Sequence, residues 1–101
     1  MAPQTRTVTV NNPEGLHARP AHMLVRLATQ FESNILVGKD SELVDCKSIL
    51  SLLTLGAAQG TELSITAQGS DAAEALDSIV QLIEAGFDDP KMQGVEPAVD
   101  S

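Results

Sequence analysis

The chain has 101 residues, which is about the length of one domain with a single small core. Fourteen acidic residues against six basic ones give a formal net charge of -8, which argues against a nucleic-acid-binding protein because such proteins carry a basic excess. A single cysteine, Cys46, excludes an intramolecular disulfide and a cysteine-rich zinc site. No apolar run approaches the roughly 18 residues of a membrane span, and the first residues lack the apolar core of a signal peptide. We therefore expect a soluble, cytoplasmic domain that does not insert into membranes.

Changes in the period of the hydrophobic pattern predict the elements of the first part of the chain. Valines that alternate with threonines predict a half-buried strand at residues 5–10. A loop over residues 11–15 follows, and helical spacing then predicts a helix from residue 18 to about residue 31. Pro20 is compatible with this helix because the N–H groups of the first turn have no intrahelical partner. The predicted buried stripe consists of Pro20, Leu24, Leu27, Ala28 and Phe31.

The middle of the chain predicts a hairpin and a short helix. Two strands at residues 34–37 and 43–46 flank residues 38–41, whose Gly-Lys-Asp-Ser sequence is typical of a turn. Ser48 can cap a two-turn helix by accepting a backbone N–H. Gly56 suits the left-handed position that ends such a helix.

A last strand and a last helix precede a polar tail. Alternation predicts a strand over residues 60–67, and Asp71 with Glu74 three residues later predicts a capping box at the start of a helix. Gly86 can end this helix, and residues 88–101 are expected to form a flexible tail. The predicted buried stripe of the helix consists of Ala72, Ala75, Leu76, Ile79 and Ile83.

The element order is therefore β-α-β-β-α-β-α. This order predicts an α+β fold, a two-layer open-faced sandwich in which three helices cover one face of a four-stranded antiparallel sheet. Thr, Ser and Glu at alternate strand positions are consistent with a second sheet face in solvent. We expect one domain over residues 1–87, followed by the tail at residues 88–101.

The segment with the most chemical content is residues 15–20, Gly-Leu-His-Ala-Arg-Pro. His17 stands where a glycine-containing loop meets a predicted helix start, whose first N–H groups lack internal partners and carry the positive end of the helix dipole. The amides of Ala18 and Arg19 and the guanidinium of Arg19 would stabilise an anion there. This pattern favours a histidine that accepts a phosphoryl group. The alternative is a histidine that acts as an ordinary helix N-cap or surface residue.

The same segment does not predict a metal site. His17 and His22 are about 140° apart around a helix, and no nearby Asp, Glu or Cys completes a ligand set at helical spacing. We therefore expect neither a metal nor another cofactor. Cys46 is interpreted as a small buried strand residue without a redox role.

The predicted two-turn helix has more apolar residues than a surface helix of that length can bury. We place Ile49, Leu52 and Leu55 on the core side, which leaves Leu50 and Leu53 on an exposed edge. Exposed apolar clusters often mark protein docking sites. A crowded core is the open alternative for each of these residues.

A second candidate docking surface lies on the helix that follows His17. Met23 shares a helical face with Arg19, His22 and Arg26, close to His17. Together the two surfaces would form an apolar centre with a basic rim that includes Lys47. The candidate docking residues are Met23, Arg26, Lys47, Ile49, Leu50 and Leu53.

Two segments carry a resemblance to a known family. Residues 15–21, Gly-Leu-His-Ala-Arg-Pro-Ala, resemble the active-site motif of the HPr family, the histidine-containing phosphocarriers of the bacterial phosphoenolpyruvate-dependent sugar phosphotransferase system. Residues 47–56 resemble the regulatory-serine helix of that family, and residues 57–61 continue the match. The resemblance covers roughly residues 5–87 and agrees with the element order derived above.

The resemblance implies a role for each candidate residue. His17 would accept a phosphoryl group on Nδ1 from phosphorylated Enzyme I and pass it to enzyme IIA domains, while Arg19 steadies the group. Ser48 would be a regulatory phosphosite for an ATP-dependent HPr kinase/phosphorylase, in lineages that have one, and its phosphate would weaken docking to Enzyme I by repulsion. The protein is thus expected to be a monomeric phosphoryl carrier and not an enzyme that turns over.

Alternatives to this function remain open at the level of the sequence. Within the family, the chain could be a nitrogen-type phosphorelay carrier. Outside phosphoryl transfer, it could be a regulatory module that docks onto transcription factors or enzymes through the Ser48 helix. Glu14 departs from the common family pattern by placing a negative charge three residues before His17, where it either slows phosphorylation or points to solvent. His22 stands where a small residue is more usual.

Overall fold

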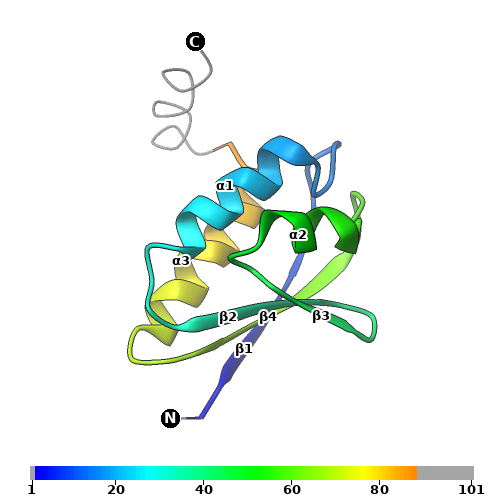
Figure 1. Ribbon diagram of the computed structural model, residues 1–101. Helices are drawn as coiled ribbons and strands as arrows, with labels where there is room; N and C mark the ends of the chain where they lie inside the picture. The colour runs from blue at the N-terminus through cyan, green and yellow to red at the C-terminus, as the bar shows by residue number, and fades with distance from the viewer. Residues whose placement is uncertain (1, 89–101) are drawn as a thin grey trace.

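The computed structural model describes residues 2–88 and arranges them in two layers, a sheet and a layer of helices (Figure 1). The elements are β1 (Gln4–Thr9), α1 (Ala18–Ala28), β2 (Asn34–Lys39), β3 (Glu42–Asp45), α2 (Ile49–Leu55), β4 (Glu62–Gln68) and α3 (Ala72–Glu84). All three helices lie on one face of the sheet. The predicted element order and the predicted α+β open-faced sandwich are therefore confirmed. The expected tail lies outside the described residues, apart from residue 88.

The four strands form one antiparallel sheet in the order β1-β4-β2-β3. β4 lies between β1 and β2, so the last strand in the chain closes the centre of the sheet between two strands from the first half. In β4 alternate residues are buried, as the period of two of a strand requires when one face is covered. The buried hydrophobic strand residues are Val8, Ile35, Val37, Leu63, Ile65 and Ala67.

The helices supply the other half of the core. α3 buries the whole predicted stripe, together with Val80 and Leu82. α1 buries Pro20, Leu24 and Ala28 of the predicted stripe and leaves Leu27 half-buried. The helix ends at Ala28 and not near residue 31 as predicted, so Phe31, also half-buried, lies beyond it. Gly56 directly follows α2 with a φ of 65°, and Gly86 follows α3 after Ala85 with a φ of 68°, so both glycines take the left-handed conformation expected at a helix end.

α1 has a wider buried face than the predicted stripe, and this overturns one assignment. Ala21 and Met23 are completely buried. The reason is that α1 packs against both α2 and α3 as well as covering the sheet, so its sides as well as its underside are enclosed. The expectation that Met23 lies on an exposed docking face is therefore wrong, because its side chain belongs to the core.

The β2–β3 hairpin is tighter than predicted. Lys39 pairs with Glu42, so the connection consists of only two residues, Asp40 and Ser41. Gly38 belongs to β2, where a Cβ would meet the Ser64 side chain of the neighbouring strand. Asp40 takes a φ of 56°, a left-handed conformation that short hairpin turns demand and that Asp tolerates better than most residues.

The predicted capping box of α3 is wrong. Asp71 does stand at the N-cap position, but its side chain makes no hydrogen bond to its own helix. Its carboxylate instead accepts hydrogen bonds from the backbone N–H groups of Glu32 and Ser33, at 2.9 and 3.0 Å, and from the Ser33 hydroxyl. The residue thus connects the start of α3 to the loop between α1 and β2.

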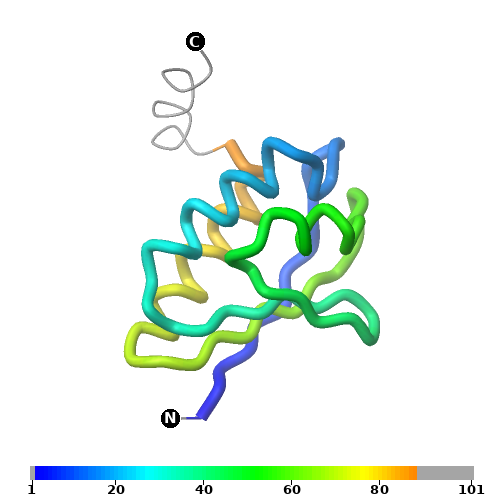
Figure 2. Tube along the Cα trace, in the orientation of Figure 1, coloured from blue at the N-terminus to red at the C-terminus, as the bar shows by residue number. Residues whose placement is uncertain are grey.

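α1 and α2 lie side by side and run in opposite directions (Figure 2). At one end, the backbone N–H of Leu16, just before α1, donates to the carbonyl of Ala57, just after α2, at 2.8 Å. At the other end, the Lys47 amino group, just before α2, donates to the carbonyl of Phe31, beyond α1, at 2.7 Å. This arrangement places the two sequence motifs on one surface of the molecule.

Candidate functional site

The loop before α1 is held against the loop after α2. Gly15 takes a φ of 67°, and a Cβ at this position would collide with the carbonyl oxygen of Ala57 and lie 2.9 Å from the Cα of Ala58. The next residue, Leu16, is buried and donates its N–H to the same carbonyl. Glycine is therefore required for close backbone approach, and this approach fixes the direction in which the chain enters α1.

His17 occupies the N-cap position of α1. Its backbone is extended, with φ -81° and ψ -175°, and its carbonyl accepts the N–H of Ala21 at 2.9 Å as the first intrahelical bond. The imidazole makes no capping hydrogen bond, and the residue is exposed. The interpretation of His17 as an ordinary capping side chain is therefore wrong, and its ring is presented to solvent at the start of the helix.

The start of α1 has the features of an anion site. The N–H groups of Ala18 and Arg19 belong to the first turn of an 11-residue helix, where no intrahelical acceptor exists. Both residues are exposed, and the first turn contains no acidic residue. The helix dipole adds positive potential at this end, and the guanidinium of Arg19 is suited to bind phosphate oxygens. His17 is thus the N-cap of α1, and Ala18 and Arg19 are its first two residues.

Asn12 is a site residue that the sequence analysis missed. It is a buried polar residue, and its side-chain nitrogen donates to the carbonyl of Gly15 at 2.9 Å while its own carbonyl accepts the N–H of Gly15 at 3.1 Å. These two bonds close the loop that leads to His17. An Asn three residues before a Gly in a loop is a signal for such a turn, because Asn side chains readily bond to nearby backbone.

Ser48 caps α2 as predicted. Its hydroxyl oxygen accepts the backbone N–H of Ser51 at 3.3 Å, and the residue is half-buried. Ser48 and His17 lie at opposite ends of the paired helices, since α2 runs from Ser48 toward the Ala57 loop. The seven residues of α2 span about 10 Å. The loop before His17 and the Ser48 cap therefore adjoin the two ends of α2.

The exposed face of α2 is apolar. Leu50 is 71% exposed, and Ile49 and Leu53 are 39% and 38% exposed, whereas Leu52 and Leu55 are buried. The assignment of Leu50 and Leu53 to an exposed edge is confirmed, and that of Leu52 and Leu55 to the core is also confirmed. The placement of Ile49 on the core side is wrong, because only the side of α2 that faces the sheet and α1 is covered. We call Ile49, Leu50 and Leu53 the apolar patch.

The three basic residues predicted to form the rim of a docking surface differ in their exposure. Arg19 is exposed, whereas Arg26 and Lys47 are half-buried. The Lys47 amino group is bonded to the Phe31 carbonyl beyond the end of α1. This contact within the protein therefore holds the charge of Lys47 beside Ser48, at the edge of the patch.

The single cysteine is buried and is not exposed on this surface. Burial raises the pKa of the Cys46 thiol to about 12, so the residue is a neutral core side chain that follows the end of β3. Within residues 2–88, no three His, Cys, Asp or Glu side chains are placed to hold a metal ion. In the same part of the chain, no helix is both long and apolar enough to cross a membrane.

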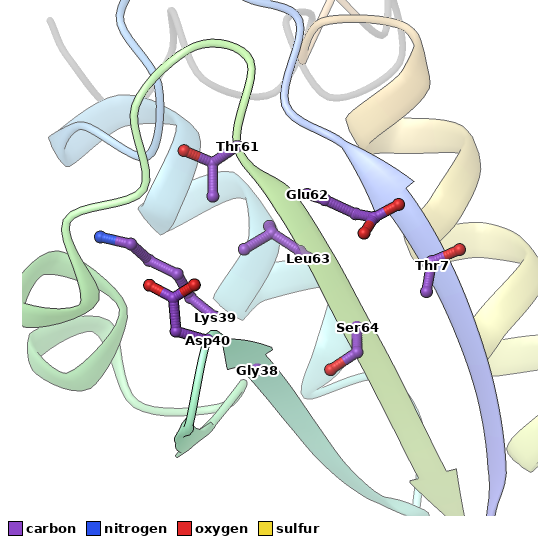
Figure 3. A pocket seen from close by; sticks show the side chains of 8 residues that line it. All are labelled: Thr7, Gly38, Lys39, Asp40, Thr61, Glu62, Leu63 and Ser64. Carbon is purple, nitrogen blue, oxygen red and sulfur yellow. The ribbon is translucent and has the colours of Figure 1, made fainter.

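A hollow of about 510 Å³ lies beside the β2–β3 hairpin. Figure 3 shows Lys39 and Asp40 of the hairpin on one side of it and Glu62 and Ser64 of β4 on the other. The Lys39 amino group also donates to the carbonyl of Leu55 at 3.2 Å, where it neutralises the end of α2. None of the candidate site residues lines this hollow.

Comparison with known proteins agrees with the geometry. Residues 4–85 match the family model described as the phosphorylation site of the HPr component of the phosphotransferase system. The chain is 37% identical to phosphocarrier protein HPr of Treponema pallidum, over 83% of this chain and 96% of that protein. It is 39% identical to phosphocarrier protein NPr of Proteus mirabilis, over 85% of this chain and 97% of that protein. It is 42% identical to a multiphosphoryl transfer protein of Vibrio cholerae, over 82% of this chain but only 22% of that longer protein.

A solved structure shows the same architecture. The crystal structure of HPr-C-His from Thermoanaerobacter tengcongensis superimposes with a TM-score of 0.82 at 41% identity, covering 85% of this chain and 97% of that chain. The chain therefore belongs to the HPr family of histidine-containing phosphocarrier proteins of the phosphotransferase system. The family resemblance inferred from the two sequence motifs is confirmed.

Proposed function

We propose that this protein carries a phosphoryl group on His17, which it accepts from phosphorylated Enzyme I and passes to enzyme IIA domains. The observation that supports this most directly is the exposed His17 ring at the N-cap of α1, which is not used for capping and stands beside Arg19. An acceptor in a carrier must be reached by two different proteins in turn. An exposed ring on a rigid helix start meets this requirement better than a ring in a deep pocket would.

The chemistry of the proposed transfer is a displacement at phosphorus. The lone pair of Nδ1 of His17 attacks the phosphoryl group, a new N–P bond forms, and the bond between phosphorus and the donor breaks. The product places negative charge beside the free N–H groups of Ala18 and Arg19 and the guanidinium of Arg19. These contacts are exposed to water and therefore stabilise the group only modestly, as a carrier that must give it up requires.

Partner docking is assigned to the surface around α2. The apolar patch lies on α2, whose two ends adjoin the His17 loop and Ser48, and we place Arg19, Arg26 and Lys47 at its rim. A patch of this kind has the apolar centre and charged rim of a transient protein interface. We propose that Enzyme I and enzyme IIA domains bind here, one after the other, to a monomer in the cytoplasm.

Ser48 is proposed as a regulatory phosphosite. Its position at the N-cap of α2 allows a phosphate without loss of the helix, since negative charge is favourable at a helix N-terminus. A phosphate would add about -1.5 to -2 charges at the edge of the apolar patch. It would therefore oppose the docking of a partner selected by the basic rim.

The carrier function is tested by incubating the protein with Enzyme I and radiolabelled phosphoenolpyruvate. The wild-type protein should acquire acid-labile label, as expected for a phosphohistidine, and His17→Ala should acquire none. His22→Ala is the matched control, because it removes the other histidine of the chain, on the same helix, and should retain the label. Absence of label on the wild-type protein, with Enzyme I active on a known carrier, would refute the proposal.

A second candidate within the family is a nitrogen-type phosphorelay carrier. The similarity to an NPr protein, which is as close as that to an HPr protein, favours this candidate. Both candidates use His17 in the same way and differ only in their partners. Measuring phosphoryl transfer from Enzyme I of the sugar system and from its nitrogen-type counterpart, side by side, separates them.

A further alternative is a regulatory module that docks onto transcription factors or enzymes through the Ser48 helix. The exposure of the apolar patch is compatible with it. In that case binding would not require His17, so His17→Ala would bind its target as well as the wild-type protein does.

A further inference from the structure

The loop that presents His17 contains a buried amide that also binds a carboxylate. The side-chain nitrogen of Asn12 has two hydrogens, of which one is donated to the carbonyl of Gly15 and the other to Oε1 of Glu14 at 3.1 Å. Asn12 is only 4% exposed, so its side chain has little freedom to turn away. Glu14 itself is exposed. A surface carboxylate is thus held in place by a buried donor, three residues before His17.

The carboxylate of Glu14 is ionised and lies within electrostatic reach of the phosphoryl site. The hydrogen bond from Asn12 is the largest of the effects that lower the pKa of Glu14, and the charges of Arg19 and His17 lower it further. Coulombic interaction is mutual, so the carboxylate of Glu14 also acts on any charge that His17 carries. Glu14 is therefore a fixed negative neighbour of the two residues that would hold the phosphoryl group.

We propose that Glu14, positioned by Asn12, lowers the stability of the phosphoryl group on His17 and so raises the tendency of this carrier to pass it on. This inference rests on the proposed function of His17. Two effects act in the same direction. The carboxylate repels the negative phosphoryl group, and it competes with that group for the guanidinium of Arg19. Both effects raise the free energy of the phosphorylated form relative to the unmodified form, so the equilibrium between the two shifts toward the unmodified one.

The expected size of the effect follows from the exposure of the groups. Like charges within one Debye length of each other in a largely aqueous environment change an equilibrium constant by about threefold to tenfold. Glu14, His17 and Arg19 are all exposed, so added salt should reduce the effect. A purely structural role of the Asn12–Glu14 bond would show no such dependence on salt.

The test compares Glu14→Gln with the wild-type protein. Glutamine keeps an oxygen that can accept from Asn12 but removes the charge. We expect the equilibrium constant for phosphoryl transfer from phosphorylated Enzyme I to rise about threefold to tenfold at low salt, and the difference to shrink at high salt. Phosphorus NMR of the equilibrated mixture measures the fraction of phosphorylated His17 directly. Glu14→Lys, which reverses the charge, should shift the equilibrium further in the same direction.

Glu74→Gln is the matched control, because it makes the same charge change at an exposed residue in the first turn of α3. The loop that contains Asn12 contacts the other end of this helix, where Asn11 bonds to the carbonyl of Glu84. Its equilibrium constant for phosphoryl transfer should equal that of the wild-type protein.

Thermal midpoints of all variants are measured in parallel, and a shift in the equilibrium constant for phosphoryl transfer without a shift in the thermal midpoint supports an electrostatic role. If the wild-type protein accepts the phosphoryl group and Glu14→Gln has the same equilibrium constant at low salt, the inference is wrong and the proposed function stands. If the wild-type protein accepts none, both are wrong.

Discussion

At the scale of single residues, the placement of His17 depends on neighbouring residues that carry no reactive group. Gly15 permits the close approach of the His17 loop to the Ala57 carbonyl, and Asn12 closes that loop from inside. His17 and Arg19 themselves are exposed and make little contribution to the core. The reactive residues are therefore positioned by backbone contacts to neighbours that the chemistry does not involve.

Replacing Gly15 with alanine should destabilise the protein through two separable causes. The φ of 67° costs a non-glycine residue about 1–2 kcal/mol, and the collision with the Ala57 carbonyl adds to this cost. Gly60→Ala is the matched control, because Gly60 also has a positive φ, of 91°, but has no atom within 4 Å of the added Cβ. Urea unfolding should show the larger loss for Gly15→Ala, and equal losses would contradict the steric part of the explanation. Phosphorylation of His17 should also slow in Gly15→Ala alone.

At the scale of elements, α2 combines a structural and a recognition role in seven residues. Two of its leucines enter the core, while the apolar patch stays in solvent. The helix is held at one end by the Ser48 cap and at the other by Gly56, with the Lys39 amino group on its last carbonyls. A helix this short is unstable alone, so these end contacts and its packing on α1 maintain the patch.

Ser48→Asp should slow phosphoryl transfer from Enzyme I without unfolding α2. Aspartate is a good N-cap, so the helix is retained while a negative charge is added beside the apolar patch. Ser48→Ala provides the control, since it weakens the cap by about 1 kcal/mol and adds no charge. Initial transfer rates at several protein concentrations should show a raised KM for Ser48→Asp only. An unchanged rate in Ser48→Asp would count against the regulatory proposal.

At the scale of the whole molecule, stability depends on contacts between segments far apart in the chain. β4 joins the two halves of the sheet, and the Asp71 carboxylate connects the start of α3 to residues 32 and 33. The Ser33 hydroxyl is the largest of the effects that lower the pKa of Asp71, followed by the Glu32 N–H. A carboxyl whose pKa is lower in the folded chain than in the unfolded one stabilises the fold when it is ionised.

The contribution of Asp71 should therefore depend on pH with a defined sign. It is fully present above the pKa of the unfolded chain, near 3.8, and is lost as the pH falls through the lower pKa of the folded chain. The thermal midpoint of the wild-type protein should exceed that of Asp71→Asn at neutral pH, and the difference should narrow below about pH 4. Asp77→Asn, which breaks only the exposed ion pair with Arg6, should change the midpoint little at any pH. A difference for Asp71→Asn that is constant with pH would contradict this explanation.

The sequence by itself determined the order of the elements, the open-faced sandwich and the segment that contains His17 and Arg19. These features rest on local signals, namely hydrophobic period, glycine and proline positions and a continuous motif, which are read from neighbouring residues.

The tertiary structure decided the features that depend on which segments, distant in the sequence, pack against each other. Met23 is buried because α1 is enclosed on several sides, and Ile49 is exposed because only one side of α2 is covered. Asp71 bonds to the α1–β2 loop and not to its own helix, because that loop offers free N–H groups close to its carboxylate. Asn12 is directed inward for a similar reason, since the packing of its loop against the α2–β4 connection shields its amide from water.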